Sequence, residues 1–187
     1  MYEDPQRYVF SPFFEITNSE NCHLKVHFPR WAMPFQSYVQ LTMLEHHLQA
    51  RPGRTVKLME RSIYSARYCF VENMYKSGVM EGSEFEVLDQ WYNFATGESG
   101  LDIGVDLIIY LRTTPEKALE RMKERNRGEE AGVPLDYLKD LHTLHEDWLI
   151  HHKFPVPAPV VGRTSQLLLL ASIFLAFVFQ LSTLTKT

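Results

Sequence analysis

Two oppositely charged side chains stand together where a short apolar run ends. Glu60 and Arg61 directly follow residues 56–59, VKLM, which have the composition of a short strand. In an open parallel sheet, ligands bind beyond the carboxyl ends of the strands. A carboxylate at that place can bind Mg²⁺, and a guanidinium group can orient an oxyanion or a hydroxyl. The other interpretation is an ordinary ion pair on the surface at a strand end.

Basic side chains are concentrated in the segment ERMKERNRGEE, residues 120–130. Arg121 and Arg125 are four positions apart and therefore share one face of a helix, and Arg127 follows them. Three guanidinium groups on so short a segment can bind a polyphosphate and stabilise charge on a transferred phosphoryl group. The alternative is a solvated helix face on which the neighbouring glutamates neutralise the arginines.

A third candidate lies in the segment WAMPFQSYV, residues 31–39. Phe35 can stack on a flat ring, and the amide of Gln36 offers an adjacent donor and acceptor, which can pair with the edge of a base. The alternative is a core phenylalanine beside a polar residue early in a helix.

Histidines gather at His142, His145, His151 and His152. No H-E-x-x-H pattern occurs and no cysteine is near, so we interpret them as residues on a helix face rather than metal ligands. The nucleophile pattern G-x-S-x-G and the phosphate-loop pattern G-x-x-x-x-G-K-[ST] do not occur in the 187 residues.

Composition limits the class of protein further. A formal net charge of −4 argues against a general nucleic-acid binder, which usually carries a basic face. Two cysteines form neither a disulfide framework nor a metal-ligand set. The N-terminal residues resemble neither a secretory signal nor a transit peptide.

Residues 167–184, LLLLASIFLAFVFQLSTL, contain no charged side chain. This length is near the lower limit for crossing a bilayer, so the segment is a candidate membrane anchor. The alternative is a hydrophobic tail that packs into the core.

The regular part of the sequence alternates between helical and strand patterns. Apolar residues at helical spacing predict a helix over 35–49, and strands are predicted over 55–59 and 105–111. Further helices are predicted from Ser62 through 74, over 83–96, from Thr114 with Pro115 at its first position, and from 134 past 148, with an interrupted strand over 156–161. The alternation indicates an α/β domain with a parallel sheet. We expect one domain over 1–160, an irregular insertion over 8–30 and a divergent tail over 161–187.

Several segments together resemble the deoxynucleoside kinases. The matching stretches are MYEDP, WAMPFQSYVQLTML, MERSIYSARYCFVENMY, DLIIYLRTTPE, ERMKERNRGEE, VPLDYL and LHEDWLI, which are collinear and cover nearly all of residues 31–153. The resemblance implies a phosphate-loop kinase fold and ATP-dependent, Mg²⁺-assisted 5′-phosphorylation of deoxynucleosides, with a preference for pyrimidines. It also implies nucleotide salvage in the cytoplasm or mitochondria, and a homodimer.

The resemblance assigns a role to each candidate residue. Glu60 would bind Mg²⁺, and Arg61 would orient the 5′-hydroxyl region. Gln36 would read the base, between Phe35 and Phe70. Four residues would shape the pocket, namely Val39, Met43, Ala66 and Met74. Tyr2 and Glu130 would bind the 3′-hydroxyl, and Tyr137 would support the wall. The lid over the ATP phosphates would consist of Arg121, Arg125 and Arg127.

The sequence departs from the family pattern at both ends. The family's first strand, phosphate loop and glutamate base lie upstream of the Tyr2 region, and no counterpart occurs here. Loss of that strand is expected to leave hydrogen-bonding groups unpaired in the middle of the sheet. A second interpretation is therefore an inactive form that binds nucleoside or pairs with a full-length subunit, with a membrane tether through residues 167–184.

Overall fold

A computed structural model describes residues 22–49, 56–127, 130, 132–164 and 175–181. The elements are, in chain order, α2 (Cys22–Leu48), β1 (Val56–Glu60), α3 (Ile63–Ser65), η1 (Ala66–Val71), α4 (Glu72–Lys76), α5 (Gly82–Asn93), η2 (Phe94–Glu98), β2 (Leu107–Arg112), α6 (Pro115–Arg125), α7 (Leu135–Leu149), β3 (Val160–Thr164) and β4 (Leu175–Leu181). The chain is thus of mixed α/β class, as its alternating pattern predicts.

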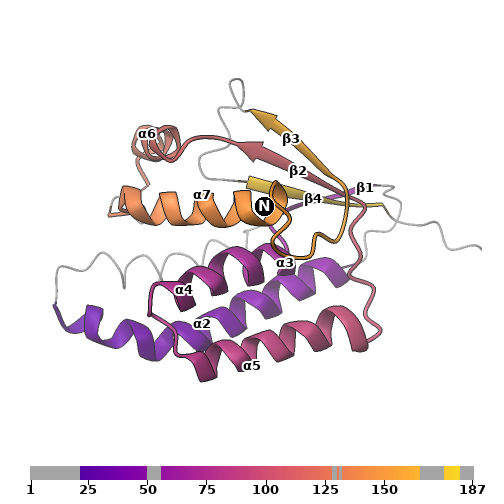
Figure 1. Cartoon of the computed structure of the whole chain (residues 1–187), viewed down its shortest axis with the longest axis horizontal. Helices are drawn as coiled ribbons and strands as arrows, with labels where there is room; N and C mark the ends of the chain where they lie inside the picture. The colour runs from indigo at the N-terminus through magenta and orange to yellow at the C-terminus, as the bar shows by residue number, and fades with distance from the viewer. Residues whose placement is uncertain (1–21, 50–55, 128–129, 131, 165–174, 182–187) are drawn as a thin grey trace, which may run out of the picture.

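The four strands form one sheet in the order β1-β4-β2-β3. Strands β2 and β3 are parallel, and β4 is antiparallel to both β1 and β2. Consequently β1, β2 and β3 run in one direction and end at the same edge, next to α6 (Figure 1). Phe177 pairs with Glu60 on one side and Ile109 on the other, which places these two residues level across the sheet. The prediction of a wholly parallel sheet is therefore wrong at β4.

The apolar tail supplies the central strand. Its residues Leu175–Leu181 lie between β1 and β2 and pair with both. The expected gap in the sheet is therefore filled, because a backbone that pairs on both sides satisfies the hydrogen-bonding groups of its neighbours. The rest of the apolar segment 167–184 lies outside the described residues. Within the described part, no helix has the length and apolar character needed to cross a membrane.

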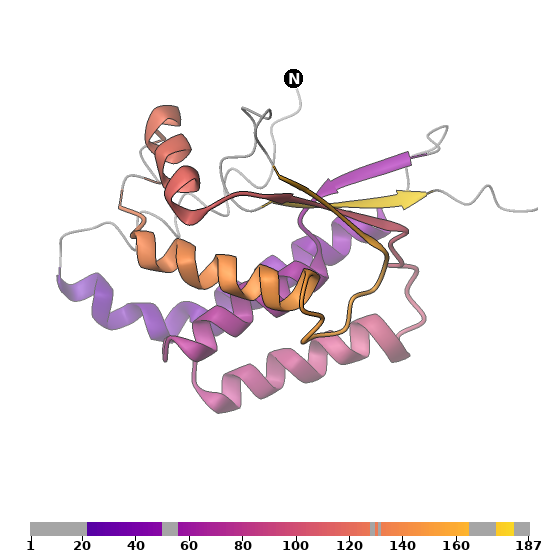
Figure 2. The ribbon, with the colours of Figure 1, turned by 45° about the horizontal axis from the view of Figure 1, so that its top comes forward.

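Helices α2, α4, α5 and α7 lie on one face of the sheet (Figure 2). The largest fully buried side chains come from both layers, and include Trp148 of α7, Tyr110 and Ile108 of β2, and Ile63 of α3. On the other face, Val56 and Leu58 of β1 are exposed. The described core therefore lies between the sheet and this layer of helices.

Local sequence signals place several helix ends. Ser62 caps α3, and its side chain accepts a hydrogen bond from the Ser65 N–H. Gly78, beyond α4, has a φ of 72°, which suits glycine. Thr114 caps α6, with Pro115 in the first turn. The predicted helix starts at Ser62 and Thr114 are confirmed, but residues 66–71 form a π-helical segment within the helix predicted from Ser62.

The irregular insertion predicted over 8–30 is wrong for its last part. Helix α2 begins at Cys22 and continues through Pro29 and Pro34, although a proline inside a helix removes a backbone hydrogen bond. Helix α2 packs against α5 and the π-helical segment, and such tertiary packing, from which most helical stability in proteins comes, can offset that cost. Residues 8–21 lie outside the described part of the chain.

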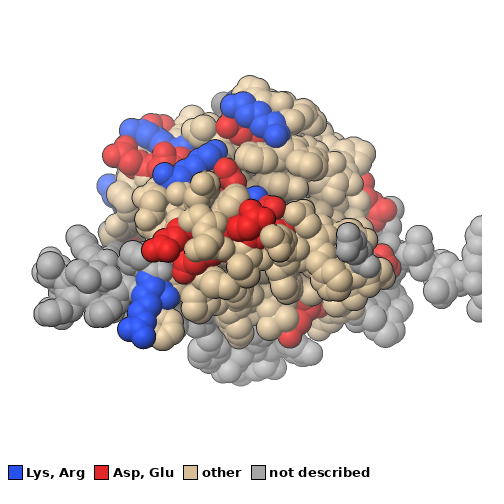
Figure 3. Space-filling view, turned by 60° about the horizontal axis from the view of Figure 1, so that its bottom comes forward, with Lys and Arg blue, Asp and Glu red and all other residues tan. Residues whose placement is uncertain are grey.

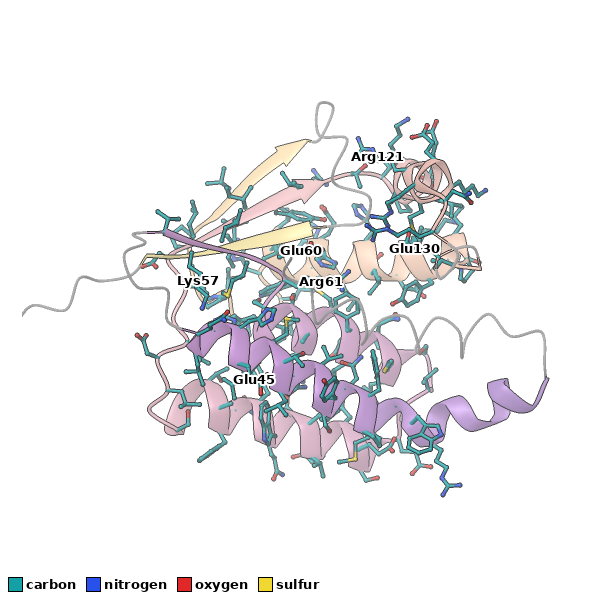
Figure 4. The ribbon with its side chains drawn as sticks, turned by 180° about the vertical axis from the view of Figure 1, so that it is seen from behind. Glu45, Lys57, Glu60, Arg61, Arg121 and Glu130 are labelled. Atoms are coloured by element: carbon teal, nitrogen blue, oxygen red, sulfur yellow. The ribbon has the colours of Figure 1, made fainter. Side chains whose placement is uncertain are left out.

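A buried lysine joins the sheet to α2. Lys57 of β1 donates hydrogen bonds from Nζ to the carbonyl oxygens of His46, His47 (2.8 Å) and Gln49 (3.1 Å). These carbonyls lie at the C-terminal end of α2, where the helix dipole favours a cation. The contact sets the end of α2 beside β1 (Figure 4). Helix α2 also carries Gln36.

Candidate active site

The chain turns sharply where β1 ends. Arg61 has a φ of 65°, in the left-handed region that residues other than glycine rarely adopt. Such backbone conformations are found preferentially at functional sites. The turn directs the Arg61 guanidinium over the ring of Phe70, 5.0 Å from its centroid. Glu60, the last residue of β1, is exposed and makes no ion pair among the described residues.

Arg61 also lies near two ionisable side chains of α7. Burial raises the pKa of Tyr137 to about 12, and the Arg61 guanidinium opposes this rise. Burial lowers the pKa of His145 to about 4, the Leu141 carbonyl opposes this fall, and the nearby Arg61 charge adds to it. The end of β1, the π-helical segment and α7 therefore meet around Arg61.

Gln36 presents an amide inside the core of the helical layer. Its side chain is 1% exposed, and Nε2 donates to the Sδ of Met74 at 3.4 Å. A thioether is a weak acceptor. The buried Oε1 has no hydrogen-bond partner among the described residues. Since buried polar atoms are normally paired, this amide is suited to a polar ligand.

Apolar and aromatic residues surround this region. Val39, Met43 and Ala66 are buried in one hydrophobic cluster, against which Phe35, Phe70 and Tyr137 pack half-buried. Phe35 also packs against a second cluster that contains Met74. Seven of the predicted nucleoside-site residues thus lie in two adjoining clusters, namely Phe35, Val39, Met43, Ala66, Phe70, Met74 and Tyr137, and Gln36 is hydrogen-bonded to Met74.

The arginine-rich segment is organised by one carboxylate. Glu130 accepts a charge-assisted hydrogen bond from Arg125 and lies 3.8 Å from Arg127 Nη1. Its side chain is 9% exposed, and its buried Oε2 has no partner among the described residues. That oxygen could accept a hydrogen bond from a hydroxyl. Figure 4 shows Arg121 and Glu130 beside α6, at the edge of the sheet where Glu60 and Arg61 lie.

The donor set suits Mg²⁺ only in part. No cluster of three or more metal-binding side chains occurs among the described residues. Mg²⁺ in phosphate-transferring sites commonly uses one or two carboxylates together with phosphate oxygens and water. The exposed carboxylate of Glu60 can provide one such ligand, and the guanidinium groups of Arg125 and Arg127 fit phosphate oxygens of ATP.

The structure does not place every predicted residue at the site, and it shows residues near the site that the sequence did not predict. Tyr2 lies outside the described residues. Of the four histidines predicted on a helix face, His142 and His145 lie in α7, where the side chain of His145 is 2% exposed and packs on Tyr110, whereas His151 and His152 lie beyond the end of the helix. Sequence reasoning also missed the buried Glu146, which binds Tyr110 and Arg112. The sequence showed only a glutamate within a predicted helix, and nothing near it indicated that its side chain faces the core.

A charged strand edge, a buried amide and an arginine-rich helix thus occur together in an α/β fold, and ligands of such folds bind beyond the carboxyl ends of the strands. The deoxynucleoside kinase family model matches residues 26–168. Mitochondrial thymidine kinase 2 of Homo sapiens is 50% identical over 133 residues, covering 71% of this chain and 49% of that protein. Deoxycytidine kinase of Bos taurus is 42% identical over 128 residues, covering 65% and 49%. The chain belongs to the deoxynucleoside kinase family, and it spans about half the length of these relatives.

Proposed function

We propose that the chain provides the nucleoside-binding part of a deoxynucleoside kinase. Such a kinase phosphorylates the 5′-hydroxyl of deoxynucleosides in nucleotide salvage, and we propose that it prefers pyrimidine deoxynucleosides. The observation that carries this proposal is the buried Gln36 amide, whose Oε1 lacks a partner among the described residues. It is surrounded by the apolar and aromatic side chains that a flat ring requires. The relatives are a thymidine kinase and deoxycytidine kinases by name, which supports a pyrimidine substrate.

Each side chain has a distinct task in this proposal. The Gln36 amide pairs with the base edge, where Oε1 accepts and Nε2 donates after leaving Met74. Phe35 and Phe70 hold the ring. Tyr2 and Glu130 bind the 3′-hydroxyl, and Glu130 has Oε2 available for it. Val39, Met43, Ala66, Met74 and Tyr137 form the wall of the pocket.

The reacting end of the nucleoside lies toward the strand edge. Arg61 orients the 5′-hydroxyl, with its guanidinium fixed over Phe70. ATP and Mg²⁺, when bound, supply the phosphoryl donor and neutralise part of its charge. Glu60 would hold the metal, and Arg121, Arg125 and Arg127 would bind the phosphates. For this family of reactions, positioning and charge neutralisation provide most of the catalysis.

Calorimetry with thymidine and deoxycytidine tests the binding part, and radiolabelled phosphoryl transfer from ATP tests the reaction. We expect saturable binding of at least one of the two nucleosides, and transfer that is lost in Arg61→Ala. Arg30→Ala, an exposed arginine of α2, is the control and should leave both unchanged. Absence of binding to either nucleoside by the folded chain would rule out the proposal.

A second candidate is a non-catalytic chain that binds nucleoside or pairs with another subunit. Trp31, Tyr38, Leu41 and Leu48 form an exposed apolar stripe along α2, and spacings of seven and three residues are typical of helix–helix contacts. Figure 3 shows broad uncharged areas between the acidic and basic groups of one face. Binding without transfer would favour this candidate.

The stripe also supports the homodimer that the family resemblance implies. Tyr38→Glu should convert a dimer to a monomer in equilibrium sedimentation, while Glu86→Gln, on the exposed side of α5, should leave it unchanged. A wild-type monomer at all accessible concentrations would remove the dimer from the proposal. We propose a mitochondrial or cytoplasmic location, and full release by carbonate extraction would dismiss a membrane tether.

A further inference from the structure

A buried carboxylate of α7 binds two residues at the end of β2. Glu146 is 8% exposed. Its Oε1 accepts hydrogen bonds from the Tyr110 hydroxyl at 3.0 Å and from Arg112 Nε at 2.8 Å, and its Oε2 accepts one from Arg112 Nη2 at 2.6 Å. The arginine therefore approaches as a two-pronged fork, the geometry that most restricts the position of both partners.

The contact of Glu146 with Arg112, called the clamp below, lies immediately before the arginine-bearing helix α6. Arg112 is the last residue of β2, Thr113 is buried, and Thr114 is the cap of α6. Two residues thus separate the clamped arginine from the first residue of α6. Because the peptide bonds are planar and the connection is so short, the position of Arg112 restricts where α6 can begin. Helix α6 also packs directly on α7.

The residue before Glu146 extends this arrangement toward β1. The His145 ring stacks on Tyr110, with centroids 6.0 Å apart and planes 10° apart. His145 is also close enough to Arg61 for the arginine charge to affect its pKa. One turn of α7 therefore contacts Tyr110 in β2 and approaches the end of β1, although β4 separates these strands in the sheet.

We propose that Glu146 is a positioning residue of this site. By holding Tyr110 and Arg112 against α7, it sets the start of α6 and so places Arg121 and Arg125 relative to the nucleoside-binding residues. This inference rests on the proposed function, because phosphate binding by those arginines gives the positioning its purpose. The competing explanation is a partly buried ion pair, with the Arg112 side chain 50% exposed, that stabilises the fold without affecting the placement of α6 in particular.

Hydrogen exchange of the full chain separates the two explanations without requiring activity. In Glu146→Gln, amides of residues 115–125 should exchange about tenfold faster, and those of residues 82–93 in α5 should be unchanged. Tyr110→Phe, which keeps the arginine fork, should give a smaller increase of about threefold. Asp136→Asn removes another carboxylate of α7, one that pairs with Lys139 at the surface, and should change neither region.

Equal acceleration in both helices, or none in residues 115–125, would overturn the positioning role. If Glu146→Gln does not fold, Arg112→Lys keeps the charge, removes the fork and makes the same prediction.

Ligand binding provides the second readout. Tripolyphosphate should bind Glu146→Gln about tenfold more weakly than the wild type, whereas thymidine affinity should stay within about twofold. Unchanged tripolyphosphate affinity despite faster exchange in α6 would also overturn the inference. If the wild type binds neither ligand, the proposed function fails, and the exchange experiment alone decides whether Glu146 places α6.

Discussion

The two halves of the candidate site are built in opposite ways. The nucleoside half comprises Phe35, Gln36, Val39, Met43, Ala66, Phe70, Met74 and Tyr137, and it is continuous with the hydrophobic core. The phosphate half comprises Glu60, Arg121, Arg125 and Arg127, in which Glu60 is exposed and the Arg127 side chain is 55% exposed. The faces of a flat base are recognised by packing, which the fold must provide beforehand. Exposed charges contribute little to stability by themselves and interact most strongly once a charged ligand binds. We therefore expect substitutions in the nucleoside half to affect folding and binding, and those in the phosphate half to affect phosphate binding.

The largest expected effect is on the shared core. Leu141→Ala, in α7 at 2% exposure, should lower the free energy of unfolding by about 2–5 kcal/mol because it leaves a cavity. Urea denaturation measures this change. Val87→Ala, at an exposed site of α5, is the matched control and should change stability by less than about 0.5 kcal/mol. Equal effects in the two variants would mean that α7 is not part of the core beneath the site.

The second-largest expected effect is a loss of stability at acid pH, caused by buried histidines. Burial lowers the pKa of His145, and also of His47, to about 4 from a usual value of 6.5. Between these values the unfolded chain binds more protons, so the free energy of unfolding falls as the pH is lowered from about 6.5 to 4. Each group can contribute up to about 3 kcal/mol to this loss.

Urea denaturation at a series of pH values compares the wild type with two variants. In His145→Gln the dependence on pH should be shallower, whereas His151→Gln should keep the wild-type slope because that side chain is exposed to solvent in the folded chain. Identical slopes in all three proteins would contradict a neutral, buried His145.

A smaller effect separates the two halves directly. Gln36→Leu should weaken thymidine binding by about 1–3 kcal/mol, because it keeps the volume but removes both groups that pair with the base. Arg127→Ala should leave thymidine affinity within about twofold and weaken tripolyphosphate binding. Calorimetry measures both ligands. If Arg127→Ala impaired thymidine binding as much as Gln36→Leu, the division into two halves would be wrong.

The smallest effect concerns the residue at the boundary between the halves. Glu130→Gln should reduce the preference for thymidine over 3′-deoxythymidine by about 1.4 kcal/mol, roughly tenfold, since a hydroxyl binds a carboxylate more strongly than an amide. Competition binding with the two nucleosides gives the ratio. An unchanged ratio would remove Glu130 from sugar recognition and leave it as the ion-pair partner of Arg125 and Arg127.

Features governed by neighbouring residues were predictable from the sequence. The starts of helices at Ser62 and Thr114 depend on a side chain that bonds to the backbone three residues later. The strands β1 and β2 were predicted within a few residues, because short apolar runs are typical of buried strands. The positions of the nucleoside half came from the family resemblance, and their roles remain proposals.

Features governed by distant residues were not predictable. The segment that contains the strand Leu175–Leu181 was expected to be either a membrane anchor or a hydrophobic tail that packs into the core, because its apolar composition suits both environments. The burial of His145 and Glu146 depends on which face of α7 meets β2. Neither residue carries a local signal for that choice, since both are usually exposed when a helix is considered alone.

The α/β class, most helix ends and membership of the deoxynucleoside kinase family follow from the amino-acid sequence, because they depend on local chemistry and on short sequence motifs. Tertiary structure alone decided that β4 completes the sheet, that Arg61 turns over Phe70, and that Glu146 joins α7 to the end of β2. The physical reason is that strand pairing and the burial of a polar side chain are settled by partners far away in the chain, whose positions no short stretch of sequence contains.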